Sequence, residues 1–378
     1  MIKIACPIAP KTGISFFRMY QPLIALQYLY PKEFSVSFFP IGKFGEAFEN
    51  TKYDVYYSCA PPILLDLQID ICKKYGVKVV LDYDDAPAQY VLPSNQCYVY
   101  TGDKECNVEY FSAPERAYKW VDGVTERMIG GKPIIFNIKR NKEVVDKMRD
   151  IRSKADMIIT PSDNIKELLI NEEGLKMPIK VIDNAVNFSE YKCVPRISDG
   201  HIRIGWVMGH SHLDDWFKLE PFLGEIADEF PNVKYVFMSQ SDIDAPNIRD
   251  EQIEVIPAVN IDNGYFNLFS NLQLDIGIAH VEDNTFNRCK SKLKFYEYSA
   301  AGVASIVSNT LYGEVAKDGE TAMVYNCYKD FKSKLRKMIK SSLLRTDIAS
   351  NAYDFTMEYK SIEAIIPEYK KALEELCR

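Results

Sequence analysis

One stretch in the last third of the chain combines two cations with a carboxylate. In "KSKLKFYEYSAAG" (290–302), Lys290 and Lys294 stand four residues apart and Glu297 follows three residues later. On one helix these side chains would lie close to the same face. Two ammonium groups beside a carboxylate suit a ligand that carries phosphates and a vicinal diol, whereas the simpler interpretation is a solvated helix face. Gly302 stands where a left-handed cap commonly ends a helix.

Two segments in the first half place polar side chains after an apolar run. "APKTGISFFRMYQP" contains Gly13, which would open a helix whose free amides could face an anion, and Arg18 in its first turns. We expect Gly13 and Arg18 to bind the donor. "LDYDDAP" places Asp82, Asp84 and Asp85 at the end of an apolar strand. These carboxylates indicate either a solvated helix cap or a site for a base, a metal or a hydroxyl group. We expect Asp84 and Asp85 to be catalytic.

Two segments in the second half have the same character. In "GWVMGHSHLDDW", glycines that allow a close backbone approach to a ligand are followed by two histidines. In "AHVEDNTFNRCKS", a polar turn precedes the lysine-rich stretch. The candidate ligand-binding residues of these two segments are Gly209, His210, Ser211, His212, Asp283, Asn284, Phe286, Asn287 and Ser291.

Apolar, strand-like runs alternate with amphipathic segments along most of the chain, which predicts parallel sheets covered by helices. The alternation lapses at about 86–140, which indicates an inserted loop region or a few short helices. It restarts after the linker-like "YKCVPRISDGHI". We predict an α/β protein of two doubly wound Rossmann-like domains whose sheets face a central cleft. The expected parts are 1–192 with its insertion, 200–350, and a C-terminal helix at 351–378 that could cross back to the first domain.

Composition limits the class of protein. The 378 residues carry a net charge of −7, which argues against a protein built mainly to hold nucleic acid. Basic residues concentrate at 132–154 and 329–345. These two stretches could form a positively charged surface, or they could be solvated helix faces. Nine scattered cysteines without a close pair indicate neither a zinc site nor a disulfide framework. With no signal-peptide pattern and no apolar run of about 20 residues, we expect a cytoplasmic protein without integral membrane association.

The segment "LDIGIAHVEDNTFNRCKSKLKFYEYSAAGVASIVSN" (274–309) resembles the C-terminal domain of retaining nucleotide-sugar glycosyltransferases with the GT-B fold, the large group 1 or family 4-like class. The resemblance implies that Glu297 accepts hydrogen bonds from the donor ribose, with ligand hydroxyls rather than core groups as its partners. It also implies that Lys290 and Lys294 face the diphosphate and that the turn at 283–287 holds the sugar. Two positions depart from the family pattern. Cys289 replaces a glutamate, and the usual arginine and lysine of an earlier loop fall on Trp206 and about Ser211.

These observations predict an enzyme that transfers a sugar from a nucleotide diphosphate sugar to an acceptor, with no obligatory metal or other cofactor. The resemblance implies that the configuration is retained. A nucleotide-sugar epimerase and a non-catalytic nucleotide-sugar binder are the alternatives. The acceptor is a surface glycan or lipid-linked saccharide, or a hydroxymethylated base of viral DNA, in which case the protein acts in the host cytoplasm. The candidate acceptor-binding residues, from the aromatic insertion and the basic stretch after it, are Tyr90, Lys139 and Arg140.

Overall fold

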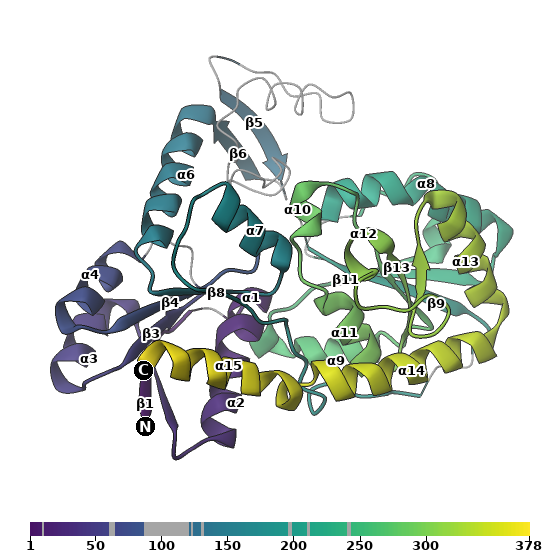
Figure 1. The fold of residues 1–378 in the computed structure, drawn as a ribbon. Helices are drawn as coiled ribbons and strands as arrows, with labels where there is room; N and C mark the ends of the chain where they lie inside the picture. The colour runs from purple at the N-terminus through teal and green to yellow at the C-terminus, as the bar shows by residue number, and fades with distance from the viewer. Residues whose placement is uncertain are drawn as a thin grey trace. The chain divides into compact units, whose positions relative to one another are not determined.

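The computed structural model (Figure 1) describes residues 1–9, 11–59, 65–86, 121, 124–129, 132–195, 199–209, 212–239 and 243–378. The chain forms two compact units. The first unit contains residues 1–185, 289–291 and 362–378, and the second contains 186–288 and 292–361.

The first unit is built on a six-stranded parallel sheet. Its strands are short and mostly apolar because both faces of a parallel sheet are covered; "VYYS" of β3 is buried at every position. In spatial order the strands are β2 (Phe34–Phe39), β1 (Ile2–Pro7), β3 (Val55–Ser58), β4 (Lys78–Asp82), β7 (Met157–Thr160) and β8 (Ile179–Val181).

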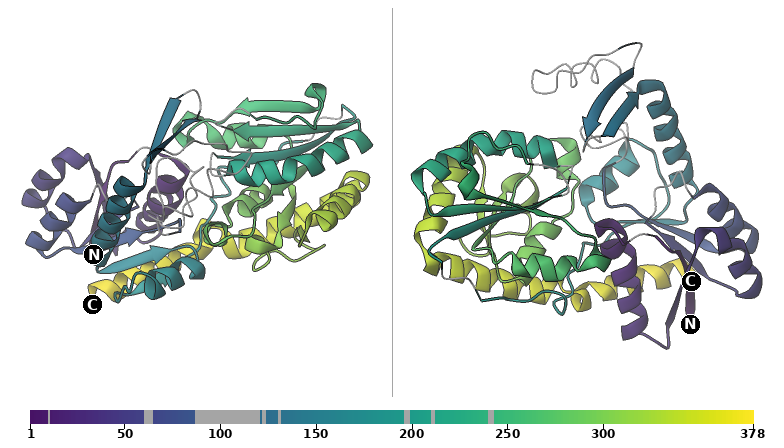
Figure 2. Two further views of the ribbon diagram at one scale, coloured as in Figure 1. Left: turned by 90° about the horizontal axis from the view of Figure 1, so that it is seen from above. Right: turned by 180° about the vertical axis from the view of Figure 1, so that it is seen from behind.

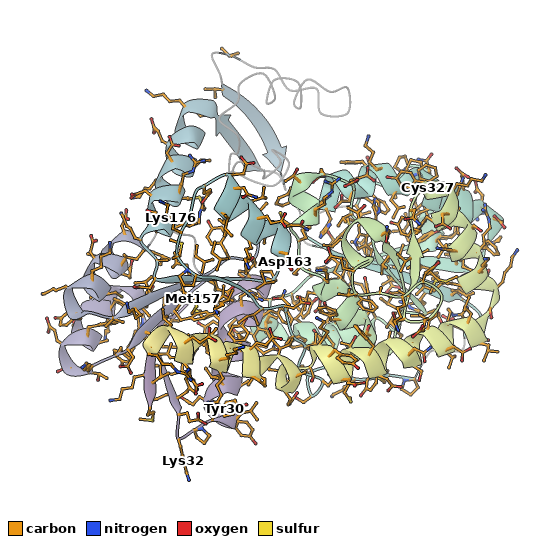
Figure 3. All side chains as sticks on the ribbon, in the orientation of Figure 1. Tyr30, Lys32, Met157, Asp163, Lys176 and Cys327 are labelled. Atoms are coloured by element: carbon orange, nitrogen blue, oxygen red, sulfur yellow. The ribbon has the colours of Figure 1, made fainter. Side chains whose placement is uncertain are left out.

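Helices flank this sheet (Figures 1 and 2). A continuous helical run follows β1 and contains one π-helical segment, η1. Figure 3 labels Tyr30 where this run ends and Met157 at the start of β7. The C-terminal helix packs on α2 and shares its apolar core. The helices are α1 (Gly13–Ser15), η1 (Phe16–Tyr20), α2 (Gln21–Leu29), η2 (Ile41–Lys43), α3 (Phe44–Asn50), α4 (Asp66–Tyr75), α6 (Ile138–Ser153), α7 (Asp163–Asn171) and α15 (Ile362–Cys377).

The described part of the insertion is an antiparallel pair of strands, β5 (Val124–Ile129) and β6 (Lys132–Asn137). Val124 pairs with Asn137 and Ile129 pairs with Lys132. The prediction of loops or short helices was therefore wrong for this part. "VTERMI" and "KPIIFN" contain the β-branched residues that strands favour, close enough in sequence for a hairpin.

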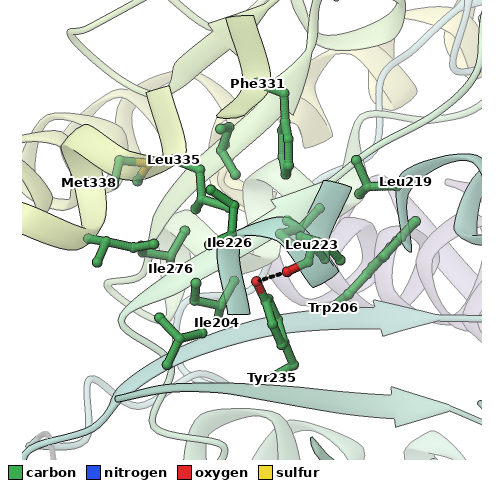
Figure 4. Close-up of a cluster of buried hydrophobic side chains, with 14 of the residues drawn as sticks. Ile204, Trp206, Leu219, Leu223, Ile226, Tyr235, Ile276, Phe331, Leu335 and Met338 are labelled. Carbon is green, nitrogen blue, oxygen red and sulfur yellow. Dashed lines mark hydrogen bonds between the residues drawn. The ribbon is translucent and has the colours of Figure 1, made fainter. Parts of the chain in front are cut away.

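A second six-stranded parallel sheet forms the second unit. Figure 4 shows its core, where Trp206 packs beside Leu219 and the Tyr235 hydroxyl donates to the Leu223 carbonyl at 2.9 Å. In spatial order the strands are β11 (Ile253–Pro257), β10 (Val233–Ser239), β9 (Ile202–Met208), β12 (Ile276–Ala279), β13 (Ala304–Ser308) and β14 (Met323–Tyr325). The prediction of two doubly wound α/β domains is therefore confirmed.

Two helices, rather than one, occupy the C-terminal range, because α14 ends at Lys360 and Ser361 is extended, with φ −68° and ψ 159°. The Val186 amide donates to the Lys360 carbonyl at 2.9 Å, just after the chain leaves the first unit. Among the described helices, none combines the length and apolarity that a membrane span requires. The helices of the second unit are α8 (Leu213–Glu229), η6 (Asp250–Gln252), η7 (Ile261–Asn263), α9 (Tyr265–Asn271), α10 (Thr285–Arg288), α11 (Leu293–Ala300), α12 (Asn309–Tyr312), α13 (Tyr328–Lys340) and α14 (Ser342–Lys360).

Candidate functional site

Helix α11 carries the carboxylate that the sequence singles out, and its C-terminal end is firmly fixed. Gly302 has a φ of 67°, and its amide donates to the Ser299 carbonyl at 3.0 Å. The Val303 amide donates to the Tyr298 carbonyl at 2.9 Å. These two hydrogen bonds form a Schellman cap, so the predicted left-handed glycine cap is confirmed.

The two lysines do not share a helical face, which corrects the prediction. Helix α11 begins only at Leu293, after a turn that separates it from α10. Lys290 therefore precedes the helix, in the segment 289–291 that clusters with the first unit, whereas Lys294 lies in the first turn of α11. The four-residue spacing places two side chains together only if the helix is continuous, and here it is interrupted.

The Glu297 side chain is buried, with 3% of its surface exposed. Its Oε1 accepts hydrogen bonds from the hydroxyls of Tyr191 and Tyr265, both at 2.9 Å. Burial raises the pKa of Glu297 above its usual value, and the charge of Lys294 and the two tyrosine hydrogen bonds oppose that rise. The expectation that no core group contacts this carboxylate is wrong. A carboxylate buried at this depth requires donors from the protein.

Sequence reasoning missed both tyrosines. Tyr191 lies 106 residues before Glu297 and Tyr265 lies 32 residues before it, so no local spacing links them. Their rings pack against Phe266 at centroid distances of 5.1 and 5.4 Å. Burial and the charge of Glu297 raise the pKa of both tyrosines well above the usual value, so both hydroxyls keep their protons at neutral pH.

Asp215 connects three segments at the carboxyl edge of the second sheet. Its Oδ2 lies 2.9 Å from Nδ1 of His212, the residue that caps the N-terminus of α8. Its Oδ1 accepts from the Glu282 amide at 2.8 Å and from Asn287 Nδ2 at 2.9 Å. Burial alone would raise the pKa of Asp215, but the hydrogen bond from His212 and the other contacts outweigh it, and the pKa is lowered. Asp215 is thus an ionised anchor for both loops.

The predicted polar turn is well ordered around α10. Asn284 Oδ1 accepts from the Asn287 amide at 2.8 Å, and exposed Asp283 pairs with Arg288 at 2.7 Å. Phe286 and Asn287 are buried. No described residue donates to Asn287 Oδ1, although this oxygen is buried. The turn therefore presents one unsatisfied acceptor next to the Asp215 anchor.

His280 follows β12 at the same edge of the sheet and was not predicted as a site residue. Its Nδ1 contacts the Tyr325 hydroxyl, and its Nε2 lies 3.1 Å from Glu282 Oε1 without hydrogen-bond geometry. The Tyr328 hydroxyl donates to the same Glu282 oxygen. The only signal in the sequence was the position of "AHVEDN" directly after an apolar run.

Arg18 has a structural role that the sequence did not predict. The side chain is completely buried, and its Nε and Nη2 donate to the two oxygens of Asp82 at 2.7 and 3.1 Å. Its Nη1 donates to the Ile182 carbonyl at 2.9 Å and to Asn184 Oδ1 at 2.7 Å. Arg18 therefore neutralises a buried carboxylate, and its role in donor binding stays a prediction. The ion pair forms because Asp82 would otherwise be a buried, unpaired charge.

Asp84 and Asp85 lie half-buried just beyond β4. Burial, followed by the charge of Asp85, raises the pKa of Asp84 to about 8. A carboxyl group with this pKa can exchange a proton near neutral pH. In the same unit Gly13 opens α1 as predicted, after Thr12, whose side chain accepts from the Ser15 amide at 3.4 Å.

The remaining candidates are less constrained. Among the described residues, no atom would lie within 4 Å of a Cβ added at Gly13 or at Gly209. Lys139 is exposed near the start of α6, and Ser291 lies in the segment that clusters with the first unit. The candidates Tyr90, His210 and Ser211, together with the side chain of Arg140, fall outside the described parts of the chain. Within the described ranges, no group of three or more His, Cys, Asp or Glu side chains is arranged to hold a metal ion.

The two units together have the fold of the GT-B glycosyltransferases. Sucrose-phosphate synthase from Thermosynechococcus elongatus is similar in structure, with a TM-score of 0.62, 11% identity, and 100% of this chain and 99% of that chain covered. HepE from Anabaena in complex with UDP and glucose is also similar in structure, with a TM-score of 0.62 and 13% identity. The match covers 99% of this chain and 100% of that chain.

A structure from Listeria monocytogenes whose name assigns it to the UDP-N-acetylglucosamine 2-epimerases has a TM-score of 0.53 and 13% identity, with 99% of this chain and 97% of that chain covered. Comparison with models of protein families finds no match. Comparison with curated proteins also finds none. At sequence identities of 11% to 13%, the structural similarity shows the fold alone.

Proposed function

We propose that this protein is a glycosyltransferase that uses a nucleotide diphosphate sugar as its donor. The observation that carries the proposal is the carboxyl edge of the second sheet. Loops after β9 and β12 are tied together there by Asp215, and the chain leads on into α11 with its buried Glu297. In open parallel sheets, ligands bind outside the carboxyl ends of the strands. HepE, which shares this fold, has been solved with UDP-glucose, so UDP-sugars are the first donors to test.

In this proposal Glu297 binds the ribose, and the turn at 283–287 with Gly209 to His212 holds the sugar and phosphates. The bond between the anomeric carbon and the diphosphate oxygen breaks, and its electron pair leaves with the diphosphate. The acceptor oxygen forms the new bond to the anomeric carbon and gives up its proton to a carboxylate or to the diphosphate. Lys290, Lys294 and helix amides would stabilise the growing negative charge without a metal.

Retention of configuration is part of the proposal, on the strength of the resemblance around Glu297. Cys289 occupies the position of a family glutamate, and burial raises the pKa of its thiol to about 12, so it is neutral. It therefore cannot supply the missing carboxylate charge. Asp84 in its ionised form is the proposed group that accepts the acceptor's proton, because a carboxylate whose pKa is about 8 is a stronger base than an ordinary one.

A saccharide, either a surface glycan or a lipid-linked sugar, is the acceptor we favour over DNA. The basic stretch at 329–345 is largely paired within the protein: Lys332 contacts Glu225 at 2.5 Å and Arg336 contacts Glu229 at 2.5 Å. In the other basic stretch, Lys154 contacts Asp66 at 3.3 Å. Such pairs reduce the positive field that a polyanion would require. A hydroxymethylated base in viral DNA remains the alternative acceptor.

Incubation with nucleotide sugars in the absence of an acceptor separates the three functional classes. A transferase should hydrolyse its donor slowly and release the nucleoside diphosphate. The epimerase alternative, whose fold is shared, should convert the donor sugar into its epimer, and a non-catalytic binder should leave the donor unchanged. Either of the last two results would reject the proposed activity. Addition of a chelator should not change the hydrolysis rate.

A further inference from the structure

We infer that Tyr191 and Tyr265 are positioning residues that hold one oxygen of Glu297, so that the other oxygen, Oε2, is presented to the ribose diol of a bound nucleotide. This role rests on the proposed function, in which Glu297 binds the ribose. The positioning role predicts that the protein binds nucleotides with both ribose hydroxyls more tightly than nucleotides without them. It assigns this preference to two side chains outside α11.

The hydrogen bonds around the carboxylate are asymmetric. Both tyrosine hydroxyls donate to Oε1, at 2.9 Å each, and two donors fill the two acceptor positions of one carboxylate oxygen. Both hydrogen bonds that the described residues donate to Glu297 end on Oε1, and none ends on Oε2. The asymmetry leaves Oε2 without a hydrogen-bond donor from the described residues, and the nearby charge of Lys294 favours the ionised form of the carboxyl group. Hydroxyl groups of a ligand would satisfy Oε2, because hydrogen bonds to an ionised acceptor are the strong ones.

Both tyrosines are held rigidly, so the direction of the carboxylate is fixed before any ligand binds. Tyr191 packs edge-on against Phe266 and Phe269, at centroid distances of 5.1 and 5.8 Å. The next residue, Lys192, donates its amide to Ser270 Oγ at 3.0 Å, which ties the segment to α9. Tyr265 is the first residue of α9. Side chains locked by packing give a binding group its preorganised geometry.

Loss of either hydroxyl should act on the ribose alone. Without one donor, Oε1 regains a free acceptor position, and the carboxylate can rotate or take up a proton instead of presenting Oε2. The contacts to the base and the diphosphate would be unchanged. A purely structural role for the tyrosines would instead weaken every nucleotide to the same extent, and this difference can be measured.

The test is calorimetric titration of the full-length protein with UDP, GDP, ADP and CDP, followed by the tightest of these and its 2′,3′-dideoxy counterpart. The wild-type protein should prefer the ribonucleotide by about tenfold to a hundredfold, as expected for hydrogen bonds to a charged group. Tyr191→Phe and Tyr265→Phe should each reduce this preference about threefold or more, and the double variant should nearly abolish it. Binding of the dideoxynucleotide should stay constant.

Tyr235→Phe is the matched control, because it removes a buried tyrosine hydroxyl that donates to a main-chain carbonyl of the same unit. It should keep the ribose preference. Equal weakening of both ligands in the Tyr191 and Tyr265 variants, or an unchanged preference, would overturn the positioning role. A wild-type protein that binds nucleotides without a ribose preference would overturn it as well, while leaving the proposed transferase standing. Absence of any nucleotide binding would reject the proposed function itself.

Discussion

At the scale of single residues, buried carboxylates have two different roles in this chain. Asp82 is buried, and both of its oxygens accept hydrogen bonds from Arg18, while Oδ2 also accepts one from the Tyr57 hydroxyl. Glu297 is buried to the same extent, with 3% of its surface exposed, but the described residues donate to only one of its oxygens. The number of donors around a carboxylate, rather than its burial, therefore separates a structural charge from a candidate binding group.

Asp84 should make stability depend on pH. Its pKa is about 8 in the folded protein, against an ordinary value of 3.8, so the folded state holds a proton that the unfolded state releases. The stability contributed by this proton is complete below about pH 4 and is lost as the pH rises towards 8. Asp84→Asn removes the ionisation. The thermal unfolding midpoints of the variant and the wild type should be measured at pH 5 and pH 9. The midpoint of the variant relative to that of the wild type should be higher at pH 9 than at pH 5. A difference that does not vary with pH would contradict this assignment.

At the scale of elements, the cap that ends α11 fixes the helix carrying Glu297. Gly302→Ala should lower the thermal unfolding midpoint, because a side chain at a positive φ costs about 1–2 kcal/mol. The new Cβ would also lie 3.0 Å from Cys193 Sγ. Gly319→Ala is the control: Gly319 has a φ of 72° but no atom within 4 Å of an added Cβ. The loss at Gly302 should therefore exceed the loss at Gly319, and equal losses would show that the contact with Cys193 is unimportant.

The elements themselves were largely predictable, since strands buried on both faces leave apolar runs such as "YDVYYSC" and "ASIVS". The contacts within the candidate site were less predictable. Contacts such as those of Tyr191 with Glu297, or of Asp215 with Glu282, join residues distant in sequence and have no periodic pattern. The start of α11 was missed because four-residue spacing does not reveal an interruption. The contacts of Arg18 were missed because its partners, Asp82 and Asn184, lie far along the chain.

At the scale of the whole molecule, the distribution of charge bears on the acceptor. The net charge is −7, and several basic side chains of the two lysine-rich stretches are paired with carboxylates. Binding of a neutral saccharide acceptor should therefore be almost insensitive to salt between 50 and about 200 mM. If DNA were the acceptor, log K would fall by about 0.9 per phosphate contact as log salt rises. A steep slope in an equilibrium binding assay would reverse our preference.

The most direct test of the central claim is mass spectrometry of candidate acceptors after incubation with a panel of nucleotide sugars. The panel of acceptors should include glycans, lipid-linked saccharides and DNA that bears hydroxymethylated bases. We expect a mass gain of one sugar on an acceptor, strongly reduced with Glu297→Gln, whose neutral side chain loses the charged hydrogen bonds to ribose, about 1.5–3 kcal/mol of binding. No mass gain on any acceptor, together with no release of nucleoside diphosphate from any donor, would contradict the claim that this protein is a glycosyltransferase.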